Sequence, residues 1–178
     1  MQWRFLLEQK DKQDILGNSW YTRSKWFGGN LRFGGFIMKE CIFCKIIAGE
    51  IPGHVVYENE HILAFLDISQ TTEGHTLIIP KVHRVDIFEM EDSEMEQVFS
   101  VVPKIARALK KSFNCMGINI VSNNGKSAGQ SVFHYHVHLI PRYGKGKDKF
   151  GIRFVSNMED YSAEELAALK ERIMANID

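Results

Sequence analysis

The sequence predicts an α+β domain built on a five-stranded antiparallel sheet. Five short apolar segments follow one another, and turn signals such as Pro52-Gly53 and Asn123-Asn124-Gly125 separate most of them. Strands joined by short turns pair antiparallel, because a parallel neighbour requires a long crossover. One long helical segment lies between the third and fourth strands. A length of 178 residues with 44% hydrophobic side chains suits one domain with a buried core.

The overall composition excludes several classes of function. The formal net charge is zero, which leaves no electrostatic basis for binding nucleic acid or a membrane surface. No apolar run approaches the roughly 20 residues that span a bilayer. The three cysteines are an odd number, and two of them form Cys41-x-x-Cys44, which argues against a disulfide scaffold. We therefore expect a cytoplasmic protein in a reducing compartment.

Residues 1–37 differ from the rest of the chain. They contain all three tryptophans and none of the seven histidines. The codons of Gly34-Gly35 can spell GGAGG, the core of a bacterial ribosome-binding site, a short distance before Met38. We expect translation to start at Met38, so that residues 1–37 are an upstream reading-frame artefact, or else a disordered or loosely attached extension. The expected domain then spans 38–145, and a C-terminal extension spans 146–178.

The first expected element is a short helix over Ile42–Ala48, which Gly49 ends. The next two segments, His54–Glu58 and Ile62–Asp67, are strand-like in composition. Only a short connection that contains Asn59-Glu60 separates them, so we expect a β-hairpin.

A third strand over His75–Ile79 precedes the long helix. The pattern Ser93-x-x-Glu96 is a capping box, in which both side chains accept hydrogen bonds from backbone N–H groups at the start of a helix. We expect the helix to run from there to about Lys111. Its apolar residues recur at helical spacing, which places one face in the core. These residues are Val98, Val101, Val102, Ile105, Ala106 and Leu109.

Two strands and a C-terminal helix complete the expected elements. The fourth strand covers Ile118–Ser122, and the fifth follows it after a turn and a loop. A second capping box, Ser162-x-x-Glu165, starts the helix, which should end at about Ala175.

The fifth strand carries three histidines, His134, His136 and His138, in alternation with apolar residues. A period of two is the side-chain period of a β-strand, so the three imidazoles should project from one face. Pro141 cannot donate to a sheet ladder, so the strand should end near Ile140.

Three imidazoles on one strand face have more than one explanation. They suit the ligands of one metal ion, a histidine-rich polar face, or catalysis. The preceding residues favour chemistry on a phosphate, because Gly129, Gln130 and Ser131 supply a flexible turn, an amide and a hydroxyl. Backbone N–H groups in such a turn bind phosphate oxygens. A neutral histidine held in one tautomer can attack phosphorus.

The run from Gly129 to Ile140 resembles the signature of the histidine triad (HIT) family, in which His-x-His-x-His is followed by two apolar residues. The galactose-1-phosphate uridylyltransferase branch has Gln at the position of His138, and the Gly-Gln-Ser-Val lead-in is similar to that of the Hint-type branch. The resemblance covers about residues 39–145. It implies an α+β fold, a two-fold homodimer and hydrolysis of purine nucleoside phosphoramidates to nucleoside monophosphate and an amine.

The resemblance also implies a role for each site residue. His136 would be the nucleophile that forms a nucleotidyl-histidine, and His75 would support it. His138 would donate a hydrogen bond to a phosphoryl oxygen, Ser131 would protonate or hydrogen-bond the leaving amine, and Asp67 would accept the ribose hydroxyls. The other implied nucleotide contacts are Phe65 and Ile68 at the base and Asn123, Gly129 and Gln130 at the phosphate.

The motif Cys41-x-x-Cys44 has two chemical explanations. A redox pair belongs in a thioredoxin-like βαβ context, which does not surround it, and a zinc knuckle needs two more ligands. His83 and His134 can complete a Cys₂His₂ tetrahedron, and the resulting set resembles that of zinc-bearing bacterial HIT proteins. Such a closed site would hold a structural zinc ion and leave the other two triad histidines for chemistry.

Two rival functions stand beside phosphoramidate hydrolysis. The first is a dinucleoside polyphosphate hydrolase of the Fhit type, which shares the triad and favours phosphoanhydride substrates. The second is a nucleotide-binding or protein-interaction module with little turnover. An intact Ser131 and nucleophile favour an enzyme, because a pure binding module needs neither.

Overall fold

The structure is a computed structural model that describes residues 41–144, 146, 148, 151 and 161–177. The expected extension over 1–37 and the expected start at Met38 lie outside the described residues. Within the described ranges, no helix has the length and apolar character to cross a membrane.

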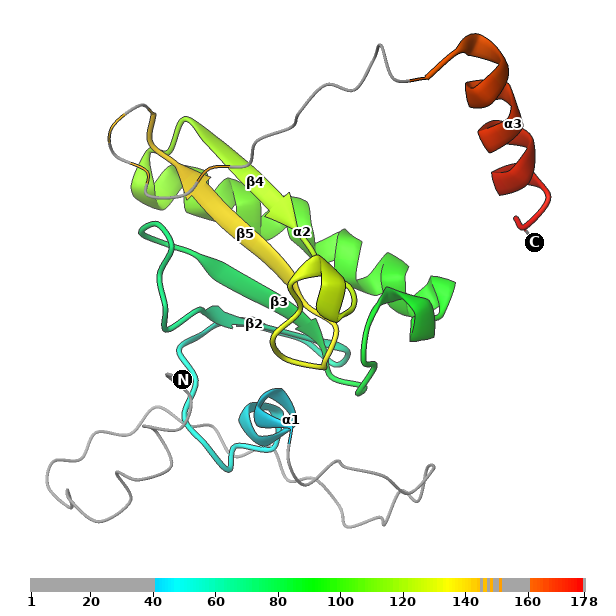
Figure 1. The fold of residues 1–178 in the computed structure, drawn as a ribbon. Helices are drawn as coiled ribbons and strands as arrows, with labels where there is room; N and C mark the ends of the chain where they lie inside the picture. Colours follow the sequence, from blue (N-terminus) through cyan, green and yellow to red (C-terminus); the bar gives the residue numbers. More distant parts are fainter. Residues whose placement is uncertain (1–40, 145, 147, 149–150, 152–160, 178) are drawn as a thin grey trace, which may run out of the picture. The chain divides into compact units, whose positions relative to one another are not determined.

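Five strands form one sheet in the order β1-β2-β3-β5-β4 (Figure 1). Every neighbouring pair is antiparallel, so the predicted α+β class and five-stranded antiparallel sheet are confirmed. The last described strand in the sequence, β5, lies between β3 and the edge strand β4, which places His138 inside the sheet rather than at its edge. The strand bounds are Val55–Glu58 for β1, Ile62–Leu66 for β2, Thr76–Pro80 for β3, Gly117–Val121 for β4 and Val137–Arg142 for β5.

The long helix α2 spans Asp92–Phe113 and packs across one face of the sheet (Figure 1). The predicted capping box at Ser93-x-x-Glu96 is wrong, because Glu91 is the N-cap and Glu94 is its partner. Arg84 gives the physical reason. Its guanidinium donates three hydrogen bonds of 2.7, 2.9 and 3.2 Å to the Glu94 carboxylate and so holds that side chain at the helix start.

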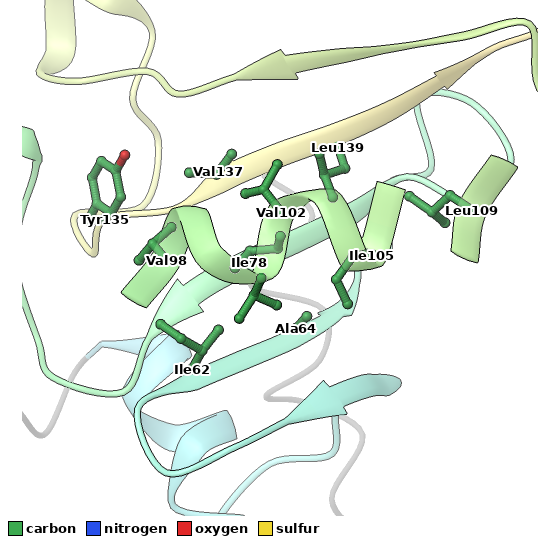
Figure 2. Packing of buried hydrophobic residues seen from close by; sticks show 11 residues of the cluster. Ile62, Ala64, Ile78, Val98, Val102, Ile105, Leu109, Tyr135, Val137 and Leu139 are labelled. Carbon is green, nitrogen blue, oxygen red and sulfur yellow. The ribbon is translucent and has the colours of Figure 1, made fainter. Parts of the chain in front are cut away.

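The predicted apolar face of α2 forms the main core of the domain (Figure 2). The apolar residues recur along the helix at the expected spacing. They contact residues of β2, β3, β5 and the segment just before β5 whose side chains point toward the helix. The buried helix residues are Val98, Val101, Val102, Ile105 and Leu109, and Ala106 is half-buried. The facing residues are Ile62, Ala64, Ile78, Tyr135, Val137 and Leu139.

The opposite face of the sheet carries a second apolar cluster beneath helix α1, which spans Ile42–Ile47. Phe43 and Ile46 from the helix pack on residues of β2 and β3 whose side chains point away from α2. Because both faces of these two strands are covered, nearly every residue in them is buried. The strand residues in this second cluster are Leu63, Phe65, Leu77 and Ile79.

The histidine segment differs from the predicted strand at both ends. β5 begins at Val137, so His134 and His136 precede the strand and only His138 lies in it. The carbonyls of His134 and His136 accept side-chain hydrogen bonds, from the His136 imidazole at 2.7 Å and from the Ser122 hydroxyl at 3.0 Å. These bonds replace the ladder bonds that a strand would need there.

At its other end, β5 continues through Pro141 to Arg142, although the sequence predicted an end near Ile140. Pro141 faces Ile118 of β4, and the pairing with β3 stops at Leu139. Pro141 therefore has a strand partner on its β4 side only, and a proline is tolerated where the sheet does not need its missing N–H. Its carbonyl accepts a hydrogen bond of 2.6 Å from the Thr72 hydroxyl.

The C-terminal helix α3 spans Ala163–Met174 and confirms the second capping box. The Ser162 hydroxyl accepts from the Glu165 N–H at 3.2 Å, and the Glu165 carboxylate accepts from the Ser162 N–H at 2.8 Å. Two short 3₁₀ helices, η2 (Ile87–Glu89) and η3 (Lys126–Ala128), complete the described elements.

Candidate active site and Cys/His cluster

The central triad histidine, His136, is buried with 4% of its surface exposed. Its Nδ1 lies 2.7 Å from the carbonyl oxygen of His134. A carbonyl can only accept, so Nδ1 carries the proton and Nε2 keeps its lone pair. Burial lowers the pKa of His136 below its ordinary value, which keeps the ring neutral. The residue thus has the state that a nucleophilic histidine needs: one fixed tautomer and one free lone pair.

The third triad histidine, His138, pairs with His75 from the start of β3. His75 Nε2 lies 2.9 Å from His138 Nδ1, and the two rings stack with centroids 5.1 Å apart. Burial, followed by the neighbouring His136 and His75, lowers the pKa of His138 to about 4. Burial also lowers the pKa of His75, although Asp67 opposes that shift. The expected support of the nucleophile by His75 is therefore indirect, because the hydrogen bond of His75 goes to His138.

Asp67 lies at the end of β2 with 8% of its surface exposed. Its Oδ1 accepts hydrogen bonds of 2.8 Å from both the N–H and the hydroxyl of Ser69, which form a turn after the strand. Its Oδ2 lies 3.7 Å from His75 Nδ1. The carboxylate therefore closes a turn beside the histidines, and Oδ2 is the oxygen with acceptor capacity left for a ligand.

The turn before the triad is built differently from the predicted phosphate site. Gly129 adopts a left-handed backbone with φ of 86°, and its N–H donates to the Lys126 carbonyl at 3.0 Å. The Gln130 N–H donates to the Gly125 carbonyl at 3.2 Å, and its buried side chain accepts from the Gly125 N–H at 2.7 Å. The Gln130 amide donates to the Val85 and Val132 carbonyls at 2.6 and 3.1 Å. Both expected phosphate donors are thus occupied within the loop, and they shape the turn instead.

Two other expected phosphate residues remain open to a ligand. Ser131 is exposed, and Asn123 is half-buried at the end of β4. Within the described part of the chain, neither side chain has a hydrogen-bond partner. The neighbouring Asn124 is different, because its amide binds the Ile87 N–H at 2.8 Å and Ser122. The geometry therefore leaves Asn123 and Ser131 available where the resemblance expected them.

The two expected walls of the base pocket have different environments. Phe65 is 2% exposed and packs in the cluster beneath α1, with its ring 5.4 Å from that of Phe43. Ile68 is 49% exposed. Phe65 is therefore a core residue in this structure, and only Ile68 presents apolar surface to solvent.

Cys41, Cys44, His83 and His134 meet in one cluster, as the sequence predicted. The sulfur of Cys41 lies 3.5 Å from His134 Nδ1, and the sulfur of Cys44 lies 3.3 Å from His83 Nδ1 and 3.6 Å from His134 Nδ1. The two Nδ1 atoms are 3.2 Å apart. A zinc tetrahedron with bonds of about 2.3 Å to sulfur and about 2.0–2.1 Å to nitrogen has S···N edges of about 3.5 Å and N···N edges of about 3.4 Å. The donor set and its spacing thus fit zinc.

Two further features of the cluster suit a metal ion. His134 Nε2 lies 2.9 Å from the Pro80 carbonyl, so Nε2 carries the proton and the Nδ1 lone pair points into the cluster. The Cys44 thiol donates to Cys41 and holds the pKa of Cys41 below its ordinary value, against the effect of burial. The same interaction raises the pKa of Cys44. A divalent cation favours the thiolate form of both cysteines.

The aromatic ring of Phe43 contacts both the Cys/His cluster and the buried His136. It lies in helix α1 between the two cysteines in sequence, and its ring is 5.9 Å from that of His134 and 5.4 Å from that of His136. Phe43 is 1% exposed. One buried aromatic ring therefore packs edge-on against both histidines, which are two residues apart in the chain.

Sequence reasoning missed three residues that hold this site: Gln70, Thr71 and Ser122. The Ser122 hydroxyl fixes the His136 carbonyl, and Gln70 and Thr71 bind the loop and the ring of His75. Their partners are backbone atoms and a ring nitrogen that only the folded loop brings into range. No local pattern in the sequence marks them.

Comparisons with known proteins agree with this geometry. A family profile described as the HIT domain matches residues 48–145. A Bacillus subtilis protein named Protein hit is 56% identical over 135 residues, which cover 76% of this chain and 92% of that protein. An adenosine 5'-monophosphoramidase from Saccharomyces cerevisiae is 36% identical over 138 residues, which cover 78% of this chain and 83% of that enzyme.

Solved structures are also similar. A crystal structure of a HIT family member from Bacillus subtilis has a TM-score of 0.76 at 53% identity, covering 79% of this chain and 99% of that one. A zinc-bound histidine triad family protein from Mycobacterium smegmatis has a TM-score of 0.59 at 39% identity, covering 77% of this chain and 98% of that one.

Proposed function

The chain belongs to the HIT family, and from that premise we propose that it hydrolyses the P–N bond of purine nucleoside 5'-phosphoramidates. One observation carries the proposal: His136 is buried and neutral, its Nδ1–H is fixed on the His134 carbonyl, and its Nε2 lone pair is free. The similarity to an adenosine 5'-monophosphoramidase supports the choice of the P–N bond.

In the first step, His136 Nε2 bonds to phosphorus, and the bond from phosphorus to the amine breaks. The exposed Ser131 hydroxyl gives a proton to the departing amine and regains one from solvent. The resulting nucleotidyl-imidazolium is positively charged, and the His134 carbonyl that accepts its Nδ1–H stabilises this charge. His138 donates a hydrogen bond to a phosphoryl oxygen.

In the second step, water attacks the phosphorus atom and the bond from phosphorus to Nε2 breaks. Nucleoside monophosphate leaves, the proton of the attacking water passes to solvent, and His136 returns to its neutral form. Each displacement inverts the configuration at phosphorus, so the proposal requires net retention.

A substrate panel tests the proposed function. Adenosine phosphoramidate and diadenosine polyphosphates are each mixed with the protein, quenched rapidly and analysed by peptide mass spectrometry. We expect an adenylyl adduct on His136 and faster turnover of the phosphoramidate. Faster turnover of the dinucleotide would favour the Fhit-type rival, and tight nucleotide binding without turnover or adduct would favour a binding module.

We propose that Cys41, Cys44, His83 and His134 hold a structural zinc ion. Their fit to zinc distances supports this, as does the similarity to a zinc-bound histidine triad family protein. A set of four protein ligands leaves no open position for substrate, so the ion would stabilise the fold. Elemental analysis should find about one zinc per chain, and zinc should be lost in Cys44→Ser but not in the control Cys115→Ala, which lies outside the cluster.

We also propose a two-fold homodimer, as the family resemblance implies, and a cytoplasmic location, since the odd number of cysteines with the Cys41-x-x-Cys44 motif suits a reducing compartment. β4 is an edge strand with Ile120 52% exposed and Met116 beside it 77% exposed, which provides an apolar edge for self-association. Sedimentation at several concentrations should give twice the chain mass of 20.5 kDa.

A further inference from the structure

In the loop between β2 and β3, the side-chain amide of Gln70 adds four hydrogen bonds to the backbone bond from the Asp67 N–H to the His75 carbonyl at 3.0 Å. The Gln70 Nε2 donates to the carbonyls of Asp67 and His75 at 2.6 and 2.7 Å. Its Oε1 accepts from the N–H groups of Gly74 and His75 at 2.8 and 3.1 Å. All four hydrogen bonds go to backbone atoms, and together they join the two ends of the loop. The two ends are Asp67, which would accept the ribose hydroxyls, and His75, which would support the triad histidines.

The residue next to Gln70 sets the direction of the hydrogen bonds between the histidines. The Thr71 N–H donates to His75 Nδ1 at 3.4 Å, whereas the Asp67 carboxylate is 3.7 Å from that atom and outside hydrogen-bond range. His75 Nδ1 is therefore an acceptor. Since burial keeps the ring neutral, its proton is on Nε2.

The same reasoning extends to His138. The Nε2–H of His75 donates to His138 Nδ1 at 2.9 Å, so Nδ1 of His138 is an acceptor as well. His138 must then carry its proton on Nε2, the nitrogen that does not face His75. Both nitrogens of His75 are used in this arrangement, which leaves that ring no lone pair for a cation.

We infer that Gln70 is a positioning residue, which holds the loop so that Thr71 and His75 fix His138 as an Nε2–H donor. This inference rests on the proposed function, because the donor matters when a phosphoryl oxygen gains charge during displacement at phosphorus. If the Gln70 bonds were lost, the Thr71 N–H could move away from His75. His75 could then adopt its other tautomer, and His138 would present a lone pair to the negatively charged oxygen.

Two variants and one control test the inference. Gln70→Met keeps the side-chain length and removes all four hydrogen bonds, whereas Gln70→Glu removes only the two donors. The control is Glu73→Gln, an exposed side chain in the same loop. We expect Gln70→Met to lower kcat about 10- to 100-fold, as the loss of an orienting contact does, with KM changed less than about twofold. Gln70→Glu should also lower kcat, and the control should match the wild type.

Long-range proton–nitrogen NMR of the histidine rings gives the readout that a purely structural role would not change. In the wild type, His75 and His138 should both be Nε2–H tautomers. In Gln70→Met, the His138 signal should shift toward the Nδ1–H tautomer while His136 stays unchanged. A folded Gln70→Met with wild-type tautomers and wild-type kcat would overturn the inference.

If both Gln70 variants fail to fold, the wild-type spectrum still tests the chain of hydrogen bonds through which Gln70 is inferred to act. A wild-type His138 in the Nδ1–H tautomer would sink the proposed chain of hydrogen bonds. Failure of the proposed function is distinguishable, because it would appear as a wild-type protein that does not turn over phosphoramidate while its rings still show the expected tautomers.

Discussion

His134 and His136 are two residues apart, yet they lie in regions of opposite character. His134 belongs to a closed cluster of four ligands, whereas His136 belongs to a histidine pocket that leaves one lone pair free. The Pro80 carbonyl accepts a hydrogen bond from Nε2–H of His134, so the Nδ1 lone pair of that ring faces the cluster. The His134 carbonyl instead accepts from Nδ1–H of His136, so the Nε2 lone pair of that ring faces the pocket. Backbone carbonyls on opposite sides of the two rings thus leave Nδ1 as the available lone pair of His134 and Nε2 as that of His136, which suits the metal and nucleophile roles proposed above.

The largest expected effect separates the two regions by chemistry. His136→Ala should lower kcat by about 10⁴-fold or more, because it removes the nucleophile itself. Its zinc content should stay close to that of the wild type. Turnover assays and elemental analysis on the same preparation provide the check. Loss of zinc in this variant would mean that the two regions are not independent.

The reverse substitution should break the cluster. His134→Ala removes one of the four ligands, and zinc binding is coupled to folding, so we expect zinc loss and a decrease in unfolding free energy of about 3 kcal/mol or more. Urea denaturation with and without added zinc measures the change. The exposed His54 supplies the control, since His54→Ala should alter neither quantity. Full zinc retention by His134→Ala would refute the assignment of this ligand.

Acid should destabilise the histidine pocket through His138. Its folded-state pKa is about 4 and its ordinary value is 6.5, so between these values the unfolded state binds more protons than the folded state. The free energy of unfolding should then fall as the pH is lowered from about 6.5 toward 4. Above that window, the domain should keep all the stability that depends on a neutral His138. Urea denaturation at a series of pH values measures this change in unfolding free energy, and the zinc content is followed in parallel. His138→Gln should show a shallower pH dependence; an equal one would contradict this cause.

The smallest expected effect concerns the Ser122 hydroxyl, which donates to the His136 carbonyl at 3.0 Å. Ser122→Ala removes this hydrogen bond and the one of 3.2 Å that the hydroxyl accepts from the Asn124 amide, and it leaves the Cys/His cluster intact. We expect a loss of about 1 kcal/mol in stability and a decrease of a few-fold in kcat, with unchanged zinc content. Ser100→Ala, an exposed serine on α2, is the matched control. A decrease in kcat as large as that expected for His136→Ala would show that the hydrogen bond to the His136 carbonyl does more than orient the residue.

Much of the fold could be predicted because it depends on local patterns. The helical spacing of Val98 to Leu109 identified the face of α2 that packs on the sheet, and the Ser162-x-x-Glu165 capping box located the start of α3. The same kind of local rule failed at α2, because Arg84 binds Glu94 from a separate segment and shifts the cap. It also failed at His134 and His136, whose carbonyls bind side chains instead of a neighbouring strand.

The site residues show the same division. The sequence predicted that Cys41, Cys44, His83 and His134 would gather, from the local Cys-x-x-Cys motif, the donor types and the resemblance to zinc-bearing HIT proteins. It did not predict that the donors of Gln130 and Gly129 bind the Gly125–Val132 turn and the Val85 carbonyl, or that Phe65 packs in the core; their nucleotide contacts stay predictions. It overlooked Gln70 altogether. Whether an amide faces a ligand or its own backbone depends on how the loop closes.

The sequence by itself determined the sheet-and-helix class, the main core face, the C-terminal helix and the chemical types gathered at the site. Periodicity, capping patterns and donor chemistry are carried by neighbouring residues, so they can be read without coordinates. Only the tertiary structure decided which ring nitrogen of each triad histidine remains available to a ligand. That choice rests on the Pro80 carbonyl for His134, the His134 carbonyl for His136 and the His75 ring for His138. Pro80 lies in β3 and His75 directly precedes that strand, and long-range contacts of this kind exist only once the sheet has formed.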